Sequence, residues 1–153
     1  MKRQIKFRGK RIDNGEWVYG DLVINQITQT YRIFTDFANV RHGSYTDSGL
    51  HECSGELYHI NPATIGQFTG LTDRNGKEIY ERDLCRVWYY KHTEPTRIII
   101  QEVLFDNGTF VLRAKNHLGL ELEDYLLYVP LYYSSAPNII EVIGNIHETQ
   151  PTL

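Results

Sequence analysis

The sequence has few cysteines and no long hydrophobic run. Its two cysteines, Cys53 and Cys85, are too few for a disulfide framework and do not form a C-x-x-C pair, so we expect a reducing environment. Its longest aliphatic run, residues 98–100, is far too short to span a bilayer, and the basic N-terminus lacks an apolar segment behind it. These absences predict a cytoplasmic protein without a membrane partner.

The common catalytic motifs are also missing. There is no G-x-S-x-G elbow, no P-loop and no G-x-G-x-x-G, so acyl transfer by a nucleophile elbow and the common nucleotide-binding folds lack their sequence motifs. A metal-dependent nuclease stays an alternative, because acidic groups can hold magnesium. The acids that would serve are Glu78, Glu81 and Asp83, or Glu121, Glu123 and Asp124. Acids at this density are usually a solvated face, so we favour a protein that is not an enzyme.

A zinc site in "HECSGELYH" would use His51, Cys53 and His59, together with His42. Zinc sites usually have closely paired ligands such as C-x₂₋₄-C or H-x₃₋₅-H, whereas this set has one short pair with a single intervening residue. We therefore favour a solvated loop with ordinary histidines, and we expect neither a metal nor another cofactor.

The stretch "TDRNGKEIYERDLCRV", residues 72–87, resembles the start of a calcium-binding loop. With Asp73 at position 1 and Asn75 at position 3, an EF-hand needs Gly at position 6 and Glu at position 12. Those positions hold Glu78 and Leu84, and Lys77 stands where an oxygen ligand is needed. The pattern argues against a calcium site.

The same stretch fits a structural turn. Asp73 can accept hydrogen bonds from backbone N–H groups, and Asn75-Gly76 can reverse the chain. Asp83 directly precedes the apolar run "LCRVWYY", where it can cap the turn that enters a strand. We therefore predict structural roles for Asp73, Asn75, Gly76 and Asp83.

Short strands dominate the predicted structure. Asn-Gly dipeptides at 14–15, 75–76 and 107–108 can form type I′ turns, and alternation on both sides of the third predicts a hairpin over residues 101–113. A second hairpin is predicted near the N-terminus, with further strands at 31–35, 56–60, 64–68, 84–91 and 138–147. Apolar residues at helical spacing over 118–129, three leucines and Val129, precede Pro130 and fit one short helix or a bent strand pair. We expect a mostly β, small antiparallel barrel-like fold with at most one or two short helices.

We expect one domain over residues 1–153, with a long surface loop at about 36–55, where Gly, Ser, Asp and His are mixed without a period. The 11 tyrosines include two adjacent pairs, and in a strand one ring of such a pair points to the exposed face. Exposed tyrosines and open sheet edges suit self-association, so we expect a homo-oligomer.

The N-terminus is basic although the net charge is −3. Lys6, Arg8 and Lys10 alternate along one face of the predicted strand, next to Trp17 or Tyr19. Such cations can follow a phosphate backbone while the rings stack on bases. The competing interpretation is an edge strand that lysines protect from pairing with other molecules. We favour the edge strand at this point, because the rest of the chain is acidic.

Three motifs in order resemble the YopX family of phage and prophage proteins: "IKFRGKRIDNGEWVYGDL", "TIGQFTGLTDRNGKEIYERDL" and "EVIGNIHETQ". The resemblance implies a mostly β, barrel-like protein that is encoded by a bacteriophage or prophage and acts in the cytoplasm of the bacterial host. It implies no catalytic residues. The family pattern often reads Glu-Gly-Asp where this chain has Glu81-Arg82-Asp83. If that glycine has positive φ, Arg82 is strained or the turn differs.

Together these features favour a non-catalytic accessory protein. Our first hypothesis is a module that interacts with a phage or host protein or assembles with itself. The alternative is a nucleic-acid binder that uses Lys6, Arg8, Lys10 and Trp17. A metal-dependent nuclease comes third.

Overall fold

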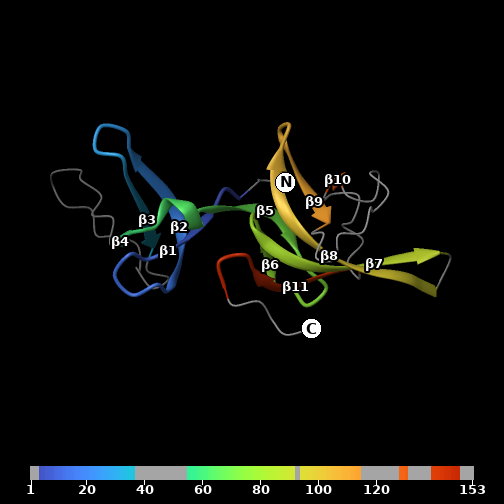
Figure 1. The fold of residues 1–153 in the computed structure, drawn as a ribbon. Helices are drawn as coiled ribbons and strands as arrows, with labels where there is room; N and C mark the ends of the chain where they lie inside the picture. Colours follow the sequence, from blue (N-terminus) through green and yellow to red (C-terminus); the bar gives the residue numbers. More distant parts are fainter. Residues whose placement is uncertain (1–3, 37–54, 92–93, 115–127, 131–138, 149–153) are drawn as a thin grey trace, which may run out of the picture. The chain divides into compact units, whose positions relative to one another are not determined.

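The computed structural model describes residues 4–36, 55–91, 94–114, 128–130 and 139–148 (Figure 1). The chain divides into two compact units. The N-terminal unit comprises residues 5–65, and the C-terminal unit comprises residues 66–153 together with residues 1–4. The single domain over 1–153 stays a prediction, and we describe each unit by itself.

The N-terminal unit is an antiparallel sheet in the order β4-β3-β2-β1. Its elements are β1 (Phe7–Lys10), β2 (Trp17–Asn25), β3 (Thr30–Asp36), β4 (Gly55–His59) and the 3₁₀-helix η1 (Pro62–Thr64). The Asn61 side chain caps η1 by accepting a hydrogen bond from the Ala63 N–H. This turn is fixed to the end of β1, because the Lys10 N–H donates to Thr64 Oγ1 at 2.8 Å.

Strand β2 changes partner along its length. Residues 17–20 pair with β1, whereas residues 21–25 pair with β3. Gly20 lies at this transition, where a Cβ atom would be 1.9 Å from the carbonyl oxygen of Phe34. The close approach of the two backbones therefore requires glycine at position 20.

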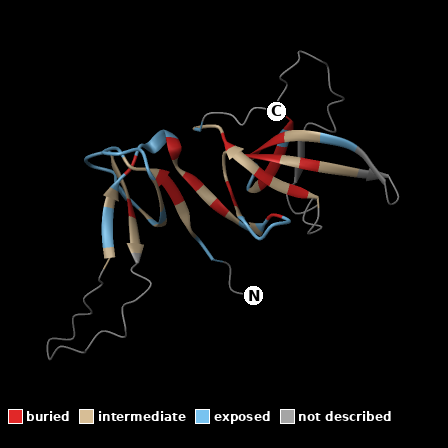
Figure 2. Cartoon of the chain, turned by 90° about the horizontal axis from the view of Figure 1, so that it is seen from below, coloured by how far each residue is buried: buried red, intermediate tan, exposed pale blue. Residues whose placement is uncertain are grey.

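The C-terminal unit contains the antiparallel pair β5–β6 and a five-stranded antiparallel sheet in the order β10-β9-β8-β7-β11. Its strands are β5 (Gly66–Thr72), β6 (Glu78–Tyr80), β7 (Asp83–Lys91), β8 (Glu94–Asp106), β9 (Thr109–Ala114), β10 (Tyr128–Pro130) and β11 (Ile140–Asn145). Alternate residues of these strands form one apolar core (Figure 2), which comprises Ile79, Cys85, Val87, Val103, Phe110, Leu112, Ile140 and Val142.

The predicted hairpin over residues 101–113 is confirmed. Asp106 and Thr109 are the last directly paired residues of β8 and β9, and Asn107 and Gly108 between them have φ values of 46° and 81°. Positive φ at both central positions is what a type I′ turn needs.

The other two Asn-Gly pairs form wider turns, and the type I′ prediction is wrong for them. The nearest strand pairs are Lys10–Trp17 and Thr72–Glu78, which leave residues 11–16 and 73–77 in the loops. In each pair only the glycine has positive φ. Side chains support these loops: Asn14 Oδ1, for example, accepts the Glu16 N–H at 3.0 Å.

The mostly β, antiparallel prediction is confirmed, and in the described part of the chain the sheets are open. The strands predicted at 31–35, 56–60 and 84–91 agree with β3, β4 and β7. The strand predicted from residue 64 begins at Gly66, because Thr64 still belongs to η1. Residues 37–54 and 116–127, which hold the predicted loop and most of the predicted helix, lie outside the described residues, whereas Val129 and Pro130 belong to β10. No helix in the described ranges is long and apolar enough to cross a membrane.

Candidate nucleic-acid interface

The register of β1 and β2 brings the predicted cations and rings together. Arg8 lies directly opposite Tyr19, and Lys10 lies opposite Trp17. Opposed residues of an antiparallel pair point to the same face, and Lys6 continues the row two residues before Arg8. We call these five residues, Lys6, Arg8, Lys10, Trp17 and Tyr19, the β1–β2 face.

Each cation of the β1–β2 face lies over an aromatic ring. Arg8 Cζ is 4.8 Å and Lys10 Nζ is 5.3 Å from the centroid of the Trp17 ring. Lys6 Nζ is 5.8 Å from the centroid of the Tyr19 ring. All three distances are within the range of cation–π attraction, so the positive charges are held in a row over the rings.

The members of this face differ in exposure. Arg8 is buried, with 6% of its surface accessible, whereas Tyr19 is 43% exposed. Lys6, Lys10 and Trp17 are half-buried. Arg8 therefore positions the Trp17 ring, while the tyrosine and the two lysines can meet a ligand.

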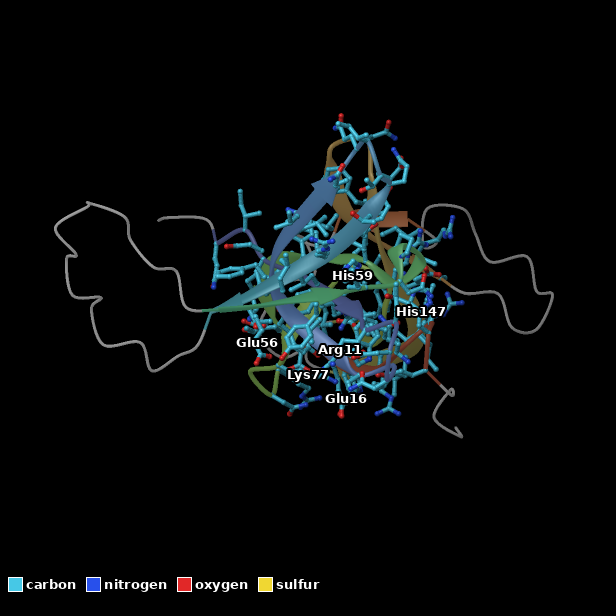
Figure 3. All side chains as sticks on the ribbon, turned by 90° about the vertical axis from the view of Figure 1, so that its left-hand side faces the viewer. Arg11, Glu16, Glu56, His59, Lys77 and His147 are labelled. Carbon is cyan, nitrogen blue, oxygen red and sulfur yellow. The ribbon has the colours of Figure 1, made fainter. Side chains whose placement is uncertain are left out.

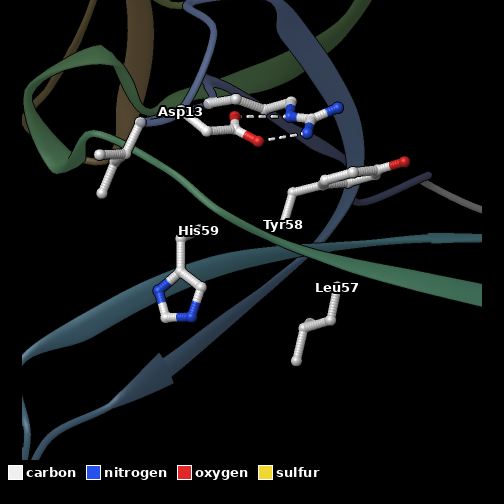
Figure 4. Close-up of a pocket in the computed structure, with 6 residues that line it drawn as sticks. Asp13, Leu57, Tyr58 and His59 are labelled. Carbon is white, nitrogen blue, oxygen red and sulfur yellow. Dashed lines mark hydrogen bonds and ion pairs between the residues drawn. The ribbon is translucent and has the colours of Figure 1, made fainter.

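A second cation–aromatic stack lies elsewhere in the N-terminal unit (Figure 4). Arg11 Cζ is 4.2 Å from the centroid of the Tyr58 ring, and the guanidinium forms an ion pair with Asp13. The hydrogen bond between them raises the pKa of Arg11 and lowers the pKa of Asp13. Because Asp13 compensates its charge, Arg11 offers little attraction to an anion.

A shallow pocket of about 310 Å³ adjoins this ion pair. The side chains that line it are Arg11, Ile12, Asp13, Leu57, Tyr58 and His59. Figure 3 shows Arg11 with Glu16 at the turn between β1 and β2, and His59 and Glu56 on the β4 side of the unit. His59, one of the histidines in the rejected zinc set, is exposed. Within the described residues no group of His, Cys, Asp and Glu could hold a metal ion, and His42, His51, Cys53 and the acids at 121–124 lie outside them.

The predicted turn residue Asp73 lies in the C-terminal unit and is buried. Its Oδ1 accepts the N–H groups of Asn75 at 2.8 Å and Lys77 at 2.9 Å. Its Oδ2 accepts the N–H of Val142 at 2.9 Å. Gly76, with a φ of 81°, completes the reversal. Both carboxylate oxygens bind backbone donors, which is the behaviour of a turn and not of a cation site.

Asp83 is buried as well, with 1% of its surface accessible. Its Oδ2 accepts the N–H of Tyr80 at 2.8 Å, and its Oδ1 accepts the side-chain amide of Asn145 at 3.4 Å. The carboxylate thus supports the turn between β6 and β7 from inside the protein.

A family model, described as YopX protein, matches residues 6–153. The chain belongs to the YopX family. It is similar to the crystal structure of protein EF1440 from Enterococcus faecalis, with 24% identity, 96% of each chain covered and a TM-score of 0.52. This likeness shows the fold alone. No curated protein matches the chain.

At the position where the resemblance implied glycine, this chain has Arg82 in the left-handed region, with a φ of 70°. Of the two outcomes expected for this position, the strained one is found. The Arg82 N–H donates to the carbonyl of Val103 at 2.8 Å, which fixes the backbone. Its guanidinium donates to Glu102 at 3.1 Å, and the side chain of Glu102 is only 8% exposed. The arginine thus gives a buried carboxylate its ionic partner.

Two cation–aromatic contacts in the C-terminal unit share the Trp88 ring, and neither was predicted from the sequence. Arg74 Cζ lies 4.7 Å from the centroid of the Trp88 ring, and Arg86 Cζ lies 6.0 Å from it. Strand alternation could have placed Arg86 beside Trp88, because the two residues are two positions apart. Arg74 stands in a separate turn, and no pattern in the sequence links it to Trp88.

Proposed function

We propose that this member of the YopX family is a non-catalytic protein that binds single-stranded nucleic acid through the β1–β2 face. The proposal includes a role as a phage or prophage accessory in the cytoplasm of the bacterial host. The row of three cations over the Trp17 and Tyr19 rings is the observation that carries it.

Charge and spacing support this proposal. The two lysines that can meet a ligand, Lys6 and Lys10, are four residues apart on an extended segment, a separation of about 13 Å, so they can contact separate phosphates of one backbone. Lysine and arginine attract that backbone whatever its base sequence. The competing interpretation, lysines that only protect an edge, does not account for the rings beneath the cations.

The exposed ring favours single strands over duplexes. Tyr19 is 43% exposed, so a base can reach the ring. Stacking of one base on an aromatic side chain contributes about 1–3 kcal/mol, and it needs bases that are not already stacked and paired in a duplex. We therefore expect tighter binding to an unstructured oligonucleotide than to a duplex.

Fluorescence anisotropy of a labelled oligothymidylate tests the proposal. At low salt we expect the Tyr19→Ala variant to bind roughly tenfold more weakly than the wild type, because a stacking ring is lost, and Tyr19→Phe to bind nearly as well. A thermal melt shows whether each variant is folded. Equal affinities for single strand and duplex, with no effect of Tyr19→Ala, would exclude this mode of binding.

Self-association is a second candidate function, favoured by apolar side chains on the β2–β3 hairpin. Ile27 at the turn is 95% exposed, and Val23 and Ile24 are 45% and 47% exposed. Such residues suit contact with a second copy of the chain. Sedimentation equilibrium should show an oligomer that Ile27→Asp dissociates and that Ile98→Asp, at an exposed position of the other unit, leaves intact. A monomeric wild type contradicts this candidate.

A further inference from the structure

Arg74 is an exposed cation whose guanidinium is held in place by an aromatic ring. Its guanidinium lies over the Trp88 ring, and among the described residues its side chain forms no hydrogen bond or ion pair. Arg86, the other cation near this ring, differs, because it donates to Glu141 at 2.9 Å. Of the two arginines near the Trp88 ring, Arg74 is therefore the one whose charge is not compensated by a carboxylate of the described residues.

The backbones of Arg74 and Trp88 are both hydrogen-bonded to the segment that leads into β11. The Arg74 N–H donates to the carbonyl of Ile140 at 2.9 Å, and the Trp88 N–H donates to the carbonyl of Ile139 at 2.9 Å. Asp73, directly before the arginine, is bound to the Val142 N–H. These bonds hold the turn and β7 against residues 139–142, so the position of Arg74 over Trp88 is built into the fold.

A guanidinium that stacks on a ring keeps its N–H donors free at the edge. The planar fork matches two oxygens of a phosphate group, and stacking lowers the freedom that the side chain would lose on binding. Such a group binds a phosphodiester better than a mobile lysine does. A base can also contact the indole beside it.

We propose that Arg74 and Trp88 form a second phosphate-binding site, which contacts the backbone of a single-stranded nucleic acid. The choice of nucleic acid as the ligand rests on the proposed function of the β1–β2 face. The phosphate-binding geometry itself does not depend on that face.

The two tryptophans of the chain allow the sites to be observed separately, because Trp17 lies in the N-terminal unit and Trp88 in the C-terminal unit. The Trp17→Phe variant emits only from Trp88, and the Trp88→Phe variant emits only from Trp17. Each full-length variant is titrated with an oligothymidylate, with inorganic polyphosphate and with polyglutamate.

In the Trp17→Phe variant we expect the oligothymidylate to change Trp88 emission. When Arg74→Gln is added to this variant, the affinity obtained from Trp88 emission should fall roughly tenfold. This is the loss expected for one charge-assisted pair of hydrogen bonds. Arg97→Gln, which removes an exposed arginine elsewhere in the same unit, is the matched control and should have little effect. A thermal melt of each variant identifies any loss of folding.

The outcomes separate the two proposals. A response of Trp17 without a response of Trp88 overturns the second site and leaves the β1–β2 face standing. A response of Trp88 that Arg74→Gln removes supports the second site, even if Trp17 is silent and the proposed function fails. An equal response to polyphosphate also supports a phosphate site, whereas a response to polyglutamate but not to the oligonucleotide overturns it.

Discussion

Asp73 accepts a hydrogen bond from the backbone N–H of Val142 at 2.9 Å, although 69 positions separate the two residues. The bond ties the 73–77 turn to β11. Both residues are buried, so water cannot replace the bond when it is broken. A stretch that resembles a calcium loop in sequence thus serves to hold two distant segments together.

We expect Asp73→Ala to lower the free energy of unfolding by about 2–4 kcal/mol, because three backbone N–H groups lose their acceptor and one of them is buried. Urea denaturation measures the change. Asp106→Ala, at an exposed aspartate of the same unit, is the control and should change stability by about 0.5 kcal/mol or less. A similar small effect of Asp73→Ala would show that the turn does not depend on its carboxylate.

The substitution Arg82→Gly should change the free energy of unfolding differently in the wild-type protein and in a Glu102→Gln variant. In the wild type, Arg82→Gly removes the partner of buried Glu102 and should destabilise by about 1–3 kcal/mol. In a Glu102→Gln background the charge is gone, and relief of the positive φ should make Arg82→Gly neutral or stabilising by about 0.5 kcal/mol. Urea denaturation of the four proteins in this double-mutant cycle measures the coupling. Additive effects would mean that the ion pair contributes nothing.

Tyr89 should make stability depend on alkaline pH. Burial raises the pKa of Tyr89, whose hydroxyl donates to Gln101 at 2.7 Å. Because the pKa of Tyr89 is raised in the folded protein, its protonated hydroxyl contributes fully to stability below the pKa of about 10 that tyrosine has in the unfolded chain. This contribution is lost as the pH rises through the higher pKa of the folded state. Denaturation between about pH 9 and pH 11 should show a steeper loss for the wild type than for Tyr89→Phe. Parallel curves would contradict the assignment.

Two glycines of the N-terminal unit should differ in their response to alanine. At Gly20 a Cβ would lie 1.9 Å from the Phe34 carbonyl oxygen, so Gly20→Ala should cost about 3 kcal/mol or more, or prevent folding. A Cβ added at Gly15 would meet no other part of the chain within 4 Å, so Gly15→Ala should cost only about 1 kcal/mol, from the positive φ. Thermal melts compare the two variants. An equal loss of stability in the two variants would contradict the close approach of the β2 and β3 backbones at Gly20.

The sequence predicted the features that depend on local order. Alternation around Asn107-Gly108 identified the β8–β9 hairpin, and the two-residue spacing of Lys6, Arg8 and Lys10 placed them on one face. Bonds between distant residues left no such pattern, because tertiary packing and not local preference decides which segments meet. The Asp73–Val142 bond and the Arg74–Trp88 stack belong to this class. The wider turns at Asn14 and Asn75 also escaped prediction, since side-chain acceptors there override the type I′ preference.

The salt dependence of oligothymidylate binding tests the β1–β2 face most directly. Each phosphate contact contributes about 0.7 to the slope of log affinity against log salt for single strands, so Lys6→Ala with Lys10→Ala should reduce the slope by about 1.4. The double variant Arg97→Ala with Arg113→Ala removes the same charge from exposed positions of the other unit and should keep the wild-type slope. Equal slopes for the two double variants, or a wild type whose binding does not depend on salt, would contradict binding at this face.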